Sequence, residues 1–68
     1  MTIDEALKYF NSGYDMCSKL HIQPSNYTRW KIQNFIPLKQ QFLINKITGA
    51  NMPIDLDIES MKKRLMEK

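Results

Sequence analysis

Near the middle of the chain, four hydrogen-bonding side chains stand close together with no acid between them. They are Ser25, Asn26, Thr28 and Arg29. An arginine can donate two parallel hydrogen bonds to guanine O6 and N7, an asparagine can pair with an adenine edge, and hydroxyl groups can bond several bases. A bidentate arginine–guanine pair contributes roughly 1–3 kcal/mol of base discrimination. These residue types are therefore candidates for contacts with base edges, and Arg29 is the first of them.

The charges of the chain are unevenly distributed, and this distribution also indicates a nucleic-acid partner. The formal net charge is only +3, yet residues 16–54 contain no Asp or Glu. The basic residues of that stretch are Lys19, Arg29, Lys31, Lys39 and Lys46. Because such a stretch produces a positive field in any fold, it suits a polyanion such as nucleic acid. A solvated basic face without a partner is the alternative.

Catalytic and metal-binding chemistry lack support in the sequence. The chain has one cysteine, Cys17, and one histidine, His21, which allows no internal disulfide and leaves too few soft ligands for a structural zinc site. No nucleophile, base and orienting acid stand in a recognisable motif. We therefore expect no enzyme, no cofactor, no metal and no small-molecule substrate. Packing is the expected role of Cys17, and a turn is the expected place of His21.

Length and composition predict one small folded domain that covers residues 1–68. Hydrophobic residues make up 43% of the chain and charged residues 25%, which is typical of a folded protein rather than a disordered tail. The longest apolar run, residues 42–44, is far shorter than the roughly 20 residues of a membrane span. The acidic N-terminal region does not resemble a signal peptide, so we expect a cytoplasmic protein with no membrane partner. Because such a chain buries only about 60% of its unfolded surface, self-association would help its stability.

The spacing of apolar residues predicts a compact all-α domain of four to five helices. Apolar residues three and four positions apart share one helix face, and capping residues and prolines mark helix starts. The expected helices cover residues 3–10, 13–21, 24–31, 37–48 and 58–67. Thr2 and Glu5 fit a capping box at the first of these starts. Residues 52–56 alternate as a strand would, which predicts a possible short extended or β segment, restricted to an edge by Pro53.

The helix expected over 37–48 is apolar on two sides. Leu38 and Phe42 fall on one side, and three further apolar residues fall on nearly the opposite side. One core cannot use both, so another subunit or the C-terminal segment must cover the second side. We expect a homodimer that is weak without its ligand, with residues 50–68 as a dimerisation or tail segment. The expected interface residues are Leu43, Ile44, Ile47, Met52 and Ile54.

Two of the expected helices form the layout of a helix-turn-helix, in which a tight turn joins two short helices. Cys17 is the small residue that lets the second helix approach closely. Leu20 and Ile22 flank the turn, and Tyr27 and Trp30 face inward from the second helix. The polar residues of the second helix then point away from the core, where such a face can enter the major groove of DNA.

Over about residues 6–50 the chain resembles the small Cro-like phage repressors, a helix-turn-helix family, with the motif itself at about 13–31. The matching residues are Leu20-His21-Ile22, Trp30-Lys31, Ile36-Pro37, Gln41 and Thr48-Gly49. The turn of these repressors usually carries glycine where this chain has His21, because the position tends to be left-handed.

The resemblance implies a transcriptional repressor that binds a short palindromic operator in double-stranded DNA as a dimer. The family's usual reading positions correspond here to Ser25, Thr28 and Arg29, and Asn26 stands beside them. The expected phosphate contacts are Ser12, Tyr14, Gln23, Lys31 and Lys39. An antitoxin-type autorepressor would look the same, and a protein-interaction module such as an antirepressor or adaptor is the rival. The polar outward face of the second helix favours DNA over that rival.

Overall fold

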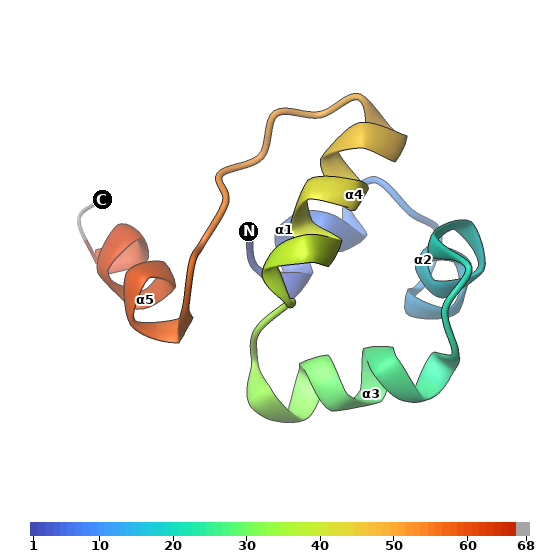
Figure 1. Cartoon of the computed structure of the whole chain (residues 1–68), viewed down its shortest axis with the longest axis horizontal. Coiled ribbons are helices and arrows are strands. Elements are labelled where there is room, and N and C mark those ends of the chain that lie inside the picture. The colour runs from blue at the N-terminus through green and yellow to red at the C-terminus, as the bar shows by residue number, and fades with distance from the viewer. Residues whose placement is uncertain (67–68) are drawn as a thin grey trace.

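In the computed structural model, which describes residues 1–66, the chain forms five α-helices and these residues contain no strand (Figure 1). The helices are α1 (Ile3–Leu7), α2 (Gly13–Leu20), α3 (Pro24–Gln33), α4 (Leu38–Thr48) and α5 (Ile58–Met66). The expected all-α class of four to five helices is thereby confirmed. The expected extension of the last helix to residue 67 lies outside the described residues. None of the described helices is long and apolar enough to cross a membrane.

Local sequence accounts for several helix ends. The Glu5 N–H donates to Thr2 Oγ1 at 3.0 Å and the Thr2 N–H donates to Glu5 Oε1 at 2.7 Å, which is the predicted capping box of α1. Asp57 Oδ1 accepts from the Ser60 N–H at 2.7 Å at the start of α5. After α4 the chain turns at Gly49 with φ 71°, a left-handed conformation that glycine adopts without steric cost.

Two helix ends differ from the expectation by more than one residue. α1 stops short of Phe10, because the Phe10 N–H donates to the carbonyl of Leu7, three residues back, and this tighter turn ends the helix. α3 continues past Lys31 to Gln33, and its C-terminal capping residue, Asn34, has φ 55°. Asparagine tolerates the left-handed region better than most residues, so Asn34 can end the helix with a turn. The helix therefore extends as far as Gln33 before the chain turns toward α4.

The core lies where α1, α2, α3 and α4 meet, and α5 lies to one side of them (Figure 1). Its buried hydrophobic side chains are Met1, Ile3, Ala6, Met16, Leu20, Trp30, Ile36, Ile44 and Met52. α5 contributes the buried Met61. The segment between α4 and α5 is extended and places Met52 in the core, so α5 is attached through the contacts of this segment as well as through helix packing.

Two amides on α4 hold the segment that follows it. Asn45 donates to the Met52 carbonyl at 2.9 Å and accepts from the Met52 N–H at 3.0 Å. One turn earlier, the Gln41 side chain donates to the Asp55 carbonyl and accepts from the Asp55 N–H, both at 2.8 Å. Because these side chains occupy backbone groups that a β-ladder would need, residues 52–56 stay extended without forming a strand.

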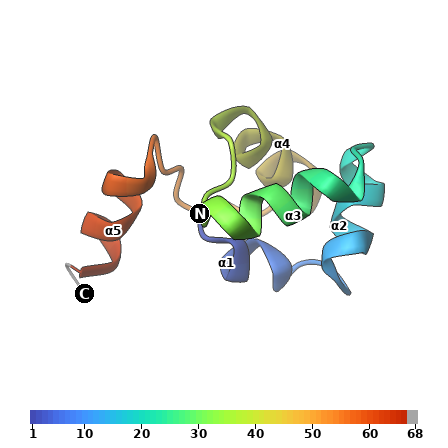
Figure 2. The ribbon, with the colours of Figure 1, turned by 90° about the horizontal axis from the view of Figure 1, so that it is seen from below.

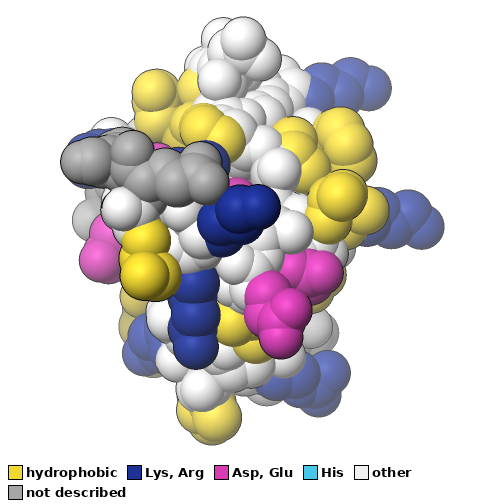
Figure 3. Space-filling model, turned by 90° about the vertical axis from the view of Figure 1, so that its left-hand side faces the viewer, with side chains coloured by type: hydrophobic (Ala, Val, Ile, Leu, Met, Phe, Trp, Pro, Cys, Tyr) yellow, Lys and Arg dark blue, Asp and Glu magenta, His cyan; other side chains and the backbone are white. Residues whose placement is uncertain are grey.

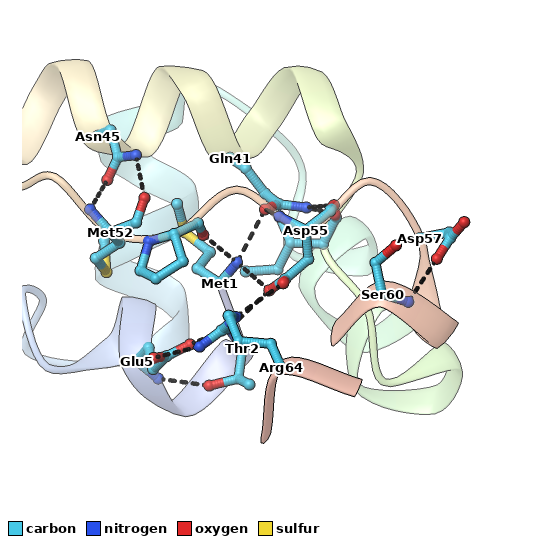
Figure 4. A network of polar contacts seen from close by, with 12 residues as sticks. Met1, Thr2, Glu5, Gln41, Asn45, Met52, Asp55, Asp57, Ser60 and Arg64 are labelled. Carbon is cyan, nitrogen blue, oxygen red and sulfur yellow. Dashed lines mark hydrogen bonds and ion pairs between the residues drawn. The ribbon is translucent and has the colours of Figure 1, made fainter. Parts of the chain in front are cut away.

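A partly buried polar cluster, the Asp55 cluster, joins distant parts of the chain and consists of Met1, Glu5, Gln41, Asp55 and Arg64 (Figure 4). The N-terminal ammonium donates to Asp55 Oδ2 at 2.5 Å and to Gln41 Oε1 at 2.9 Å. Arg64 donates to both Asp55 oxygens at 2.9 and 2.8 Å and to Glu5 Oε1 at 3.0 Å. The Arg64 hydrogen bonds, helped by the ammonium, hold the pKa of Asp55 below its ordinary value against the opposing effect of burial.

The structure corrects two expected dimer contacts. Ile44 is completely buried and Met52 is 9% exposed, and both pack in the core of this chain. They cannot reach a second chain, because the Asn45 and Gln41 side chains draw the C-terminal segment over this side of α4. Local coverage, the alternative to a partner subunit, therefore accounts for these residues. The other expected contacts remain at least partly accessible: Leu43, Ile47 and Ile54.

Candidate nucleic-acid interface

The turn between α2 and α3 uses a left-handed residue at the expected place. His21 has φ 58° and ψ 42°, the conformation that glycine would adopt most easily. Its N–H donates to the Ser18 carbonyl at 3.2 Å, and the Ile22 N–H donates to the Cys17 carbonyl at 3.0 Å. These bonds satisfy carbonyls at the end of α2. Leu20 on α2 is buried and Ile22 packs against the core, so the two helices cross in a fixed way.

Close packing of α2 against α3 depends on Gly13 as well as on Cys17. A Cβ atom added at Gly13 would lie 2.1 Å from Cε2 of Tyr27, far inside van der Waals contact. Cys17 is 1% exposed, and burial raises the pKa of its thiol, so it packs as a neutral group and is a poor nucleophile. The sequence interpretation used Gly13 only as a helix start. Its position one helical turn before Cys17, on the same face, was the available signal.

The outward face of α3 is polar over its first two turns, where Ser25, Thr28 and Arg29 lie. α3 runs along the lower edge of the molecule in Figure 1 and faces the viewer in Figure 2. Trp30 is 2% exposed and Tyr27 is half-buried, so this side of the helix faces the core. Ser25, Thr28 and Arg29 are exposed on the other side. The helix therefore presents these three side chains to solvent on a support that its buried aromatic residues fix.

Two of the four expected base-reading side chains also bond within their own helix. The Asn26 amide and the Thr28 hydroxyl donate to backbone carbonyls at the start of α3, at 3.3 and 3.4 Å. Asn26 is half-buried, so its amide is less available than the sequence suggested. The Thr28 hydroxyl keeps its lone pairs free to accept. Ser25 and Arg29 make no side-chain hydrogen bond within the described part of the chain.

At the start of α2, two expected phosphate contacts lie beside an acid. Ser12 Oγ caps the helix by accepting from the Asp15 N–H at 3.0 Å, which leaves its own proton free to donate. Tyr14 is 70% exposed. A hydrogen bond from the Asn11 N–H and the nearby Lys19 ammonium lower the pKa of Asp15, so this carboxylate stays charged. A phosphate at this helix end would meet that negative charge, which makes Ser12 and Tyr14 weaker candidates than the others.

The remaining expected phosphate contacts flank α3. Gln23 is exposed at the start of α3 and makes no capping bond, and Lys39 is exposed in the first turn of α4. Lys31 behaves differently, because its ammonium lies 4.6 Å from the centroid of the Tyr27 ring. A cation–π contact of this kind contributes about 0.5–1 kcal/mol at an exposed site. Lys31 would have to give up that contact to bind a phosphate.

The ion pairs of the described chain engage three acids, Glu5, Asp15 and Asp55, and leave most of the basic residues in the middle of the chain unpaired. Within residues 1–66, the salt bridges join Lys19 to Asp15 and connect members of the Asp55 cluster. No described salt bridge includes the four basic residues of α3 and α4: Arg29, Lys31, Lys39 and Lys46. The side that carries α5 is of mixed charge, with acidic side chains next to Lys and Arg (Figure 3). The positive field of α3 and α4 is therefore not cancelled by direct pairing.

The arrangement brings Ser25, Thr28 and Arg29 onto one exposed face and leaves Asn26 at its side and Lys31 folded over Tyr27. Gln41, a residue that carries part of the resemblance, is fully buried and holds the C-terminal segment. Its role depends on a partner distant in sequence, so no local pattern could assign it. No protein-family model, no curated protein and no solved structure matches the chain.

Proposed function

We propose that this protein is a sequence-specific DNA-binding repressor of the Cro type, with α3 as the helix that enters the major groove. The observation that carries the proposal is Arg29, an exposed guanidinium with no partner in the described chain, on the solvent-facing side of α3 that also carries Ser25 and Thr28. A guanidinium held in this way can reach guanine O6 and N7 without first breaking an ion pair. Ser25 and Thr28 stand beside it to bond neighbouring bases or touch a thymine methyl group.

Phosphate contacts would supply most of the affinity and set the register on DNA. Gln23 at the start of α3 and Lys39 at the start of α4 are the candidates that the surroundings favour. Two copies would place their α3 helices one DNA turn apart, roughly 34 Å, on a near-palindromic operator. A dimer bound at a promoter would repress transcription by occupying the DNA that polymerase needs.

A binding titration tests this proposal directly. Sequences selected by the protein from randomised duplexes are compared with random DNA by fluorescence polarisation at two salt concentrations. We expect the selected duplex to bind at least about a thousandfold more tightly. We also expect the logarithm of the affinity to fall with the logarithm of salt by about 0.9 for each phosphate contact. Absence of any salt-sensitive binding would refute the proposal.

A second candidate function, a protein-interaction module, has one observation in its favour. Phe42 on α4 is 58% exposed and lines a shallow groove with Lys39, Lys46, Leu43 and Gln40. In the described chain, Gln40 Oε1 is buried in this region and accepts no hydrogen bond. An acidic amphipathic segment would suit such a groove. The two functions separate by mutation, because an adaptor would lose its partner with Phe42→Ala and keep it with Arg29→Ala.

A further inference from the structure

The outward face of α3 contains one large apolar residue, Ile32, whose side chain is 82% exposed. It follows Ser25 by seven positions, Thr28 by four and Arg29 by three, and these spacings place all four on one side of a helix. Trp30, on the opposite side, is 2% exposed. Ile32 therefore lies among the expected base-reading side chains, about 10 Å along the helix axis from Ser25.

The fold itself makes little use of Ile32. An isoleucine that is 82% exposed contributes almost nothing to the core, and its β-branched side chain has a lower helix propensity than lysine or glutamine at a solvent-facing position. The end of α3 is fixed by its neighbours, because Gln33 donates to the Phe35 carbonyl at 2.8 Å and Asn34 adopts the left-handed conformation. α3 thus presents the apolar Ile32 side chain to any surface that binds its outward face.

We propose that Ile32 is a specificity-determining residue that packs against the C5-methyl group of a thymine in the major groove. This inference rests on the proposed function and deepens it by naming the base. Thymine alone carries an apolar group on its major-groove edge, whereas the other three bases present only hydrogen-bond donors and acceptors. Packing Ile32 on those polar edges would remove water without replacing its hydrogen bonds, which is unfavourable. The preferred thymine lies next to the bases that Arg29 and Thr28 contact.

Replacing thymine by uracil removes only the methyl group and so tests the contact. A preferred duplex is first selected from randomised DNA, and each of its thymines is then replaced in turn. Binding of the wild type, Ile32→Ala and Leu56→Ala is measured by fluorescence polarisation. At one position we expect the replacement to weaken wild-type binding about fourfold, as expected for one buried methyl-sized group, and to leave Ile32→Ala unaffected. Leu56, which is 69% exposed between α4 and α5, supplies the control that responds as the wild type.

Several results would overturn the role of Ile32 while leaving DNA binding in place. They are a preferred site without thymine, wild-type binding that no uracil replacement weakens, and an Ile32→Ala variant that responds to uracil as the wild type does. A lowered melting temperature of Ile32→Ala would also overturn it, because the residue would then serve the fold. Failure to bind or select any duplex would instead refute the proposed function, and the inference with it.

Discussion

At the scale of single residues, substitution of Arg29 distinguishes an effect on base recognition from an effect on folding. Its guanidinium is exposed and makes no bond in the described chain, so Arg29→Ala should leave the melting temperature unchanged. We expect this variant to lose roughly 1–3 kcal/mol on the preferred duplex, as for a lost bidentate guanine contact, and much less on random DNA. Lys62→Ala on α5 is the control. An equal loss on both duplexes would show that Arg29 contacts only phosphate.

Asp55 is a buried carboxylate whose ion pairs contribute to stability. Asp55→Asn would leave the buried N-terminal ammonium without its carboxylate and Arg64 with Glu5 as its remaining carboxylate partner, and removing one partner of a buried pair costs about 3–5 kcal/mol. Denaturant unfolding near neutral pH, with wild type and variant side by side, measures this loss. An unchanged unfolding midpoint would show that the Asp55 cluster contributes nothing to stability.

The same carboxylate makes stability depend on pH with a definite sign. Arg64 and the ammonium lower the pKa of Asp55 in the folded chain below its ordinary value of 3.8. Its contribution is therefore fully present above that ordinary value and is lost as the pH falls through the lowered value. The free energies of unfolding of wild type and Asp55→Asn should converge in acid. A difference that stays constant down to about pH 2 would contradict this linkage.

At the scale of elements, the contact of Gly13 with the Tyr27 ring holds α2 and α3 together. Gly13→Ala places a methyl group where the ring now lies, and overpacking of this kind typically costs about 1–3 kcal/mol. The ring must move, and α3 is expected to move with it. In a Tyr27→Ala background the same substitution should have almost no effect, and this double-mutant cycle isolates the contact. Additive losses would show that Gly13 matters for another reason.

The sequence predicts those parts of the fold that depend on neighbouring residues. The capping box of Thr2 and Glu5, the proline at the start of α3 and the left-handed Gly49 after α4 are all visible locally. The exposure of Ser25, Thr28 and Arg29 on α3 also follows from spacing alone, because Trp30 fixes which side is buried. Boundaries are less predictable, since a tightened turn such as the one before Phe10 leaves no strong mark in the sequence.

The sequence could not predict which distant segment of the chain covers each apolar side of α4. The apolar pattern of α4 shows that two sides need covering, but it does not say which segment covers which side. The pattern assigns Ile44 to a partner, because nothing in it indicates that Gln41 and Asn45 bind the backbone of residues 52–55. Amides are ordinary on a helix surface, so their bonds become apparent only once the segment is placed.

At the scale of the whole molecule, pairing on DNA is the open prediction. Ile47 on α4 is 41% exposed and Leu65 on α5 is 42% exposed, so the two offer a matched comparison. If the exposed side of α4 joins two copies, Ile47→Glu should weaken binding to a full operator more than to a half-site, and Leu65→Glu should not. Sedimentation of the complex gives the stoichiometry. One protein per operator, with no second binding step at high concentration, would refute the dimer.

The Asp55 cluster also bears on how long the native state lasts. Its hydrogen bonds join Met1 to Asp55, 54 positions apart, and Glu5 to Arg64, 59 positions apart. Closing loops of this length costs more chain entropy than forming local helix contacts. We expect these bonds to form after the folding transition state, in which case they slow unfolding without speeding folding. Arg64→Met, which keeps the apolar stem, should therefore steepen the decay of the native state in stopped-flow unfolding and leave the refolding rate nearly unchanged. The Asp55 cluster would then set the unfolding rate, and so the lifetime of the folded chain, through contacts that form last during folding.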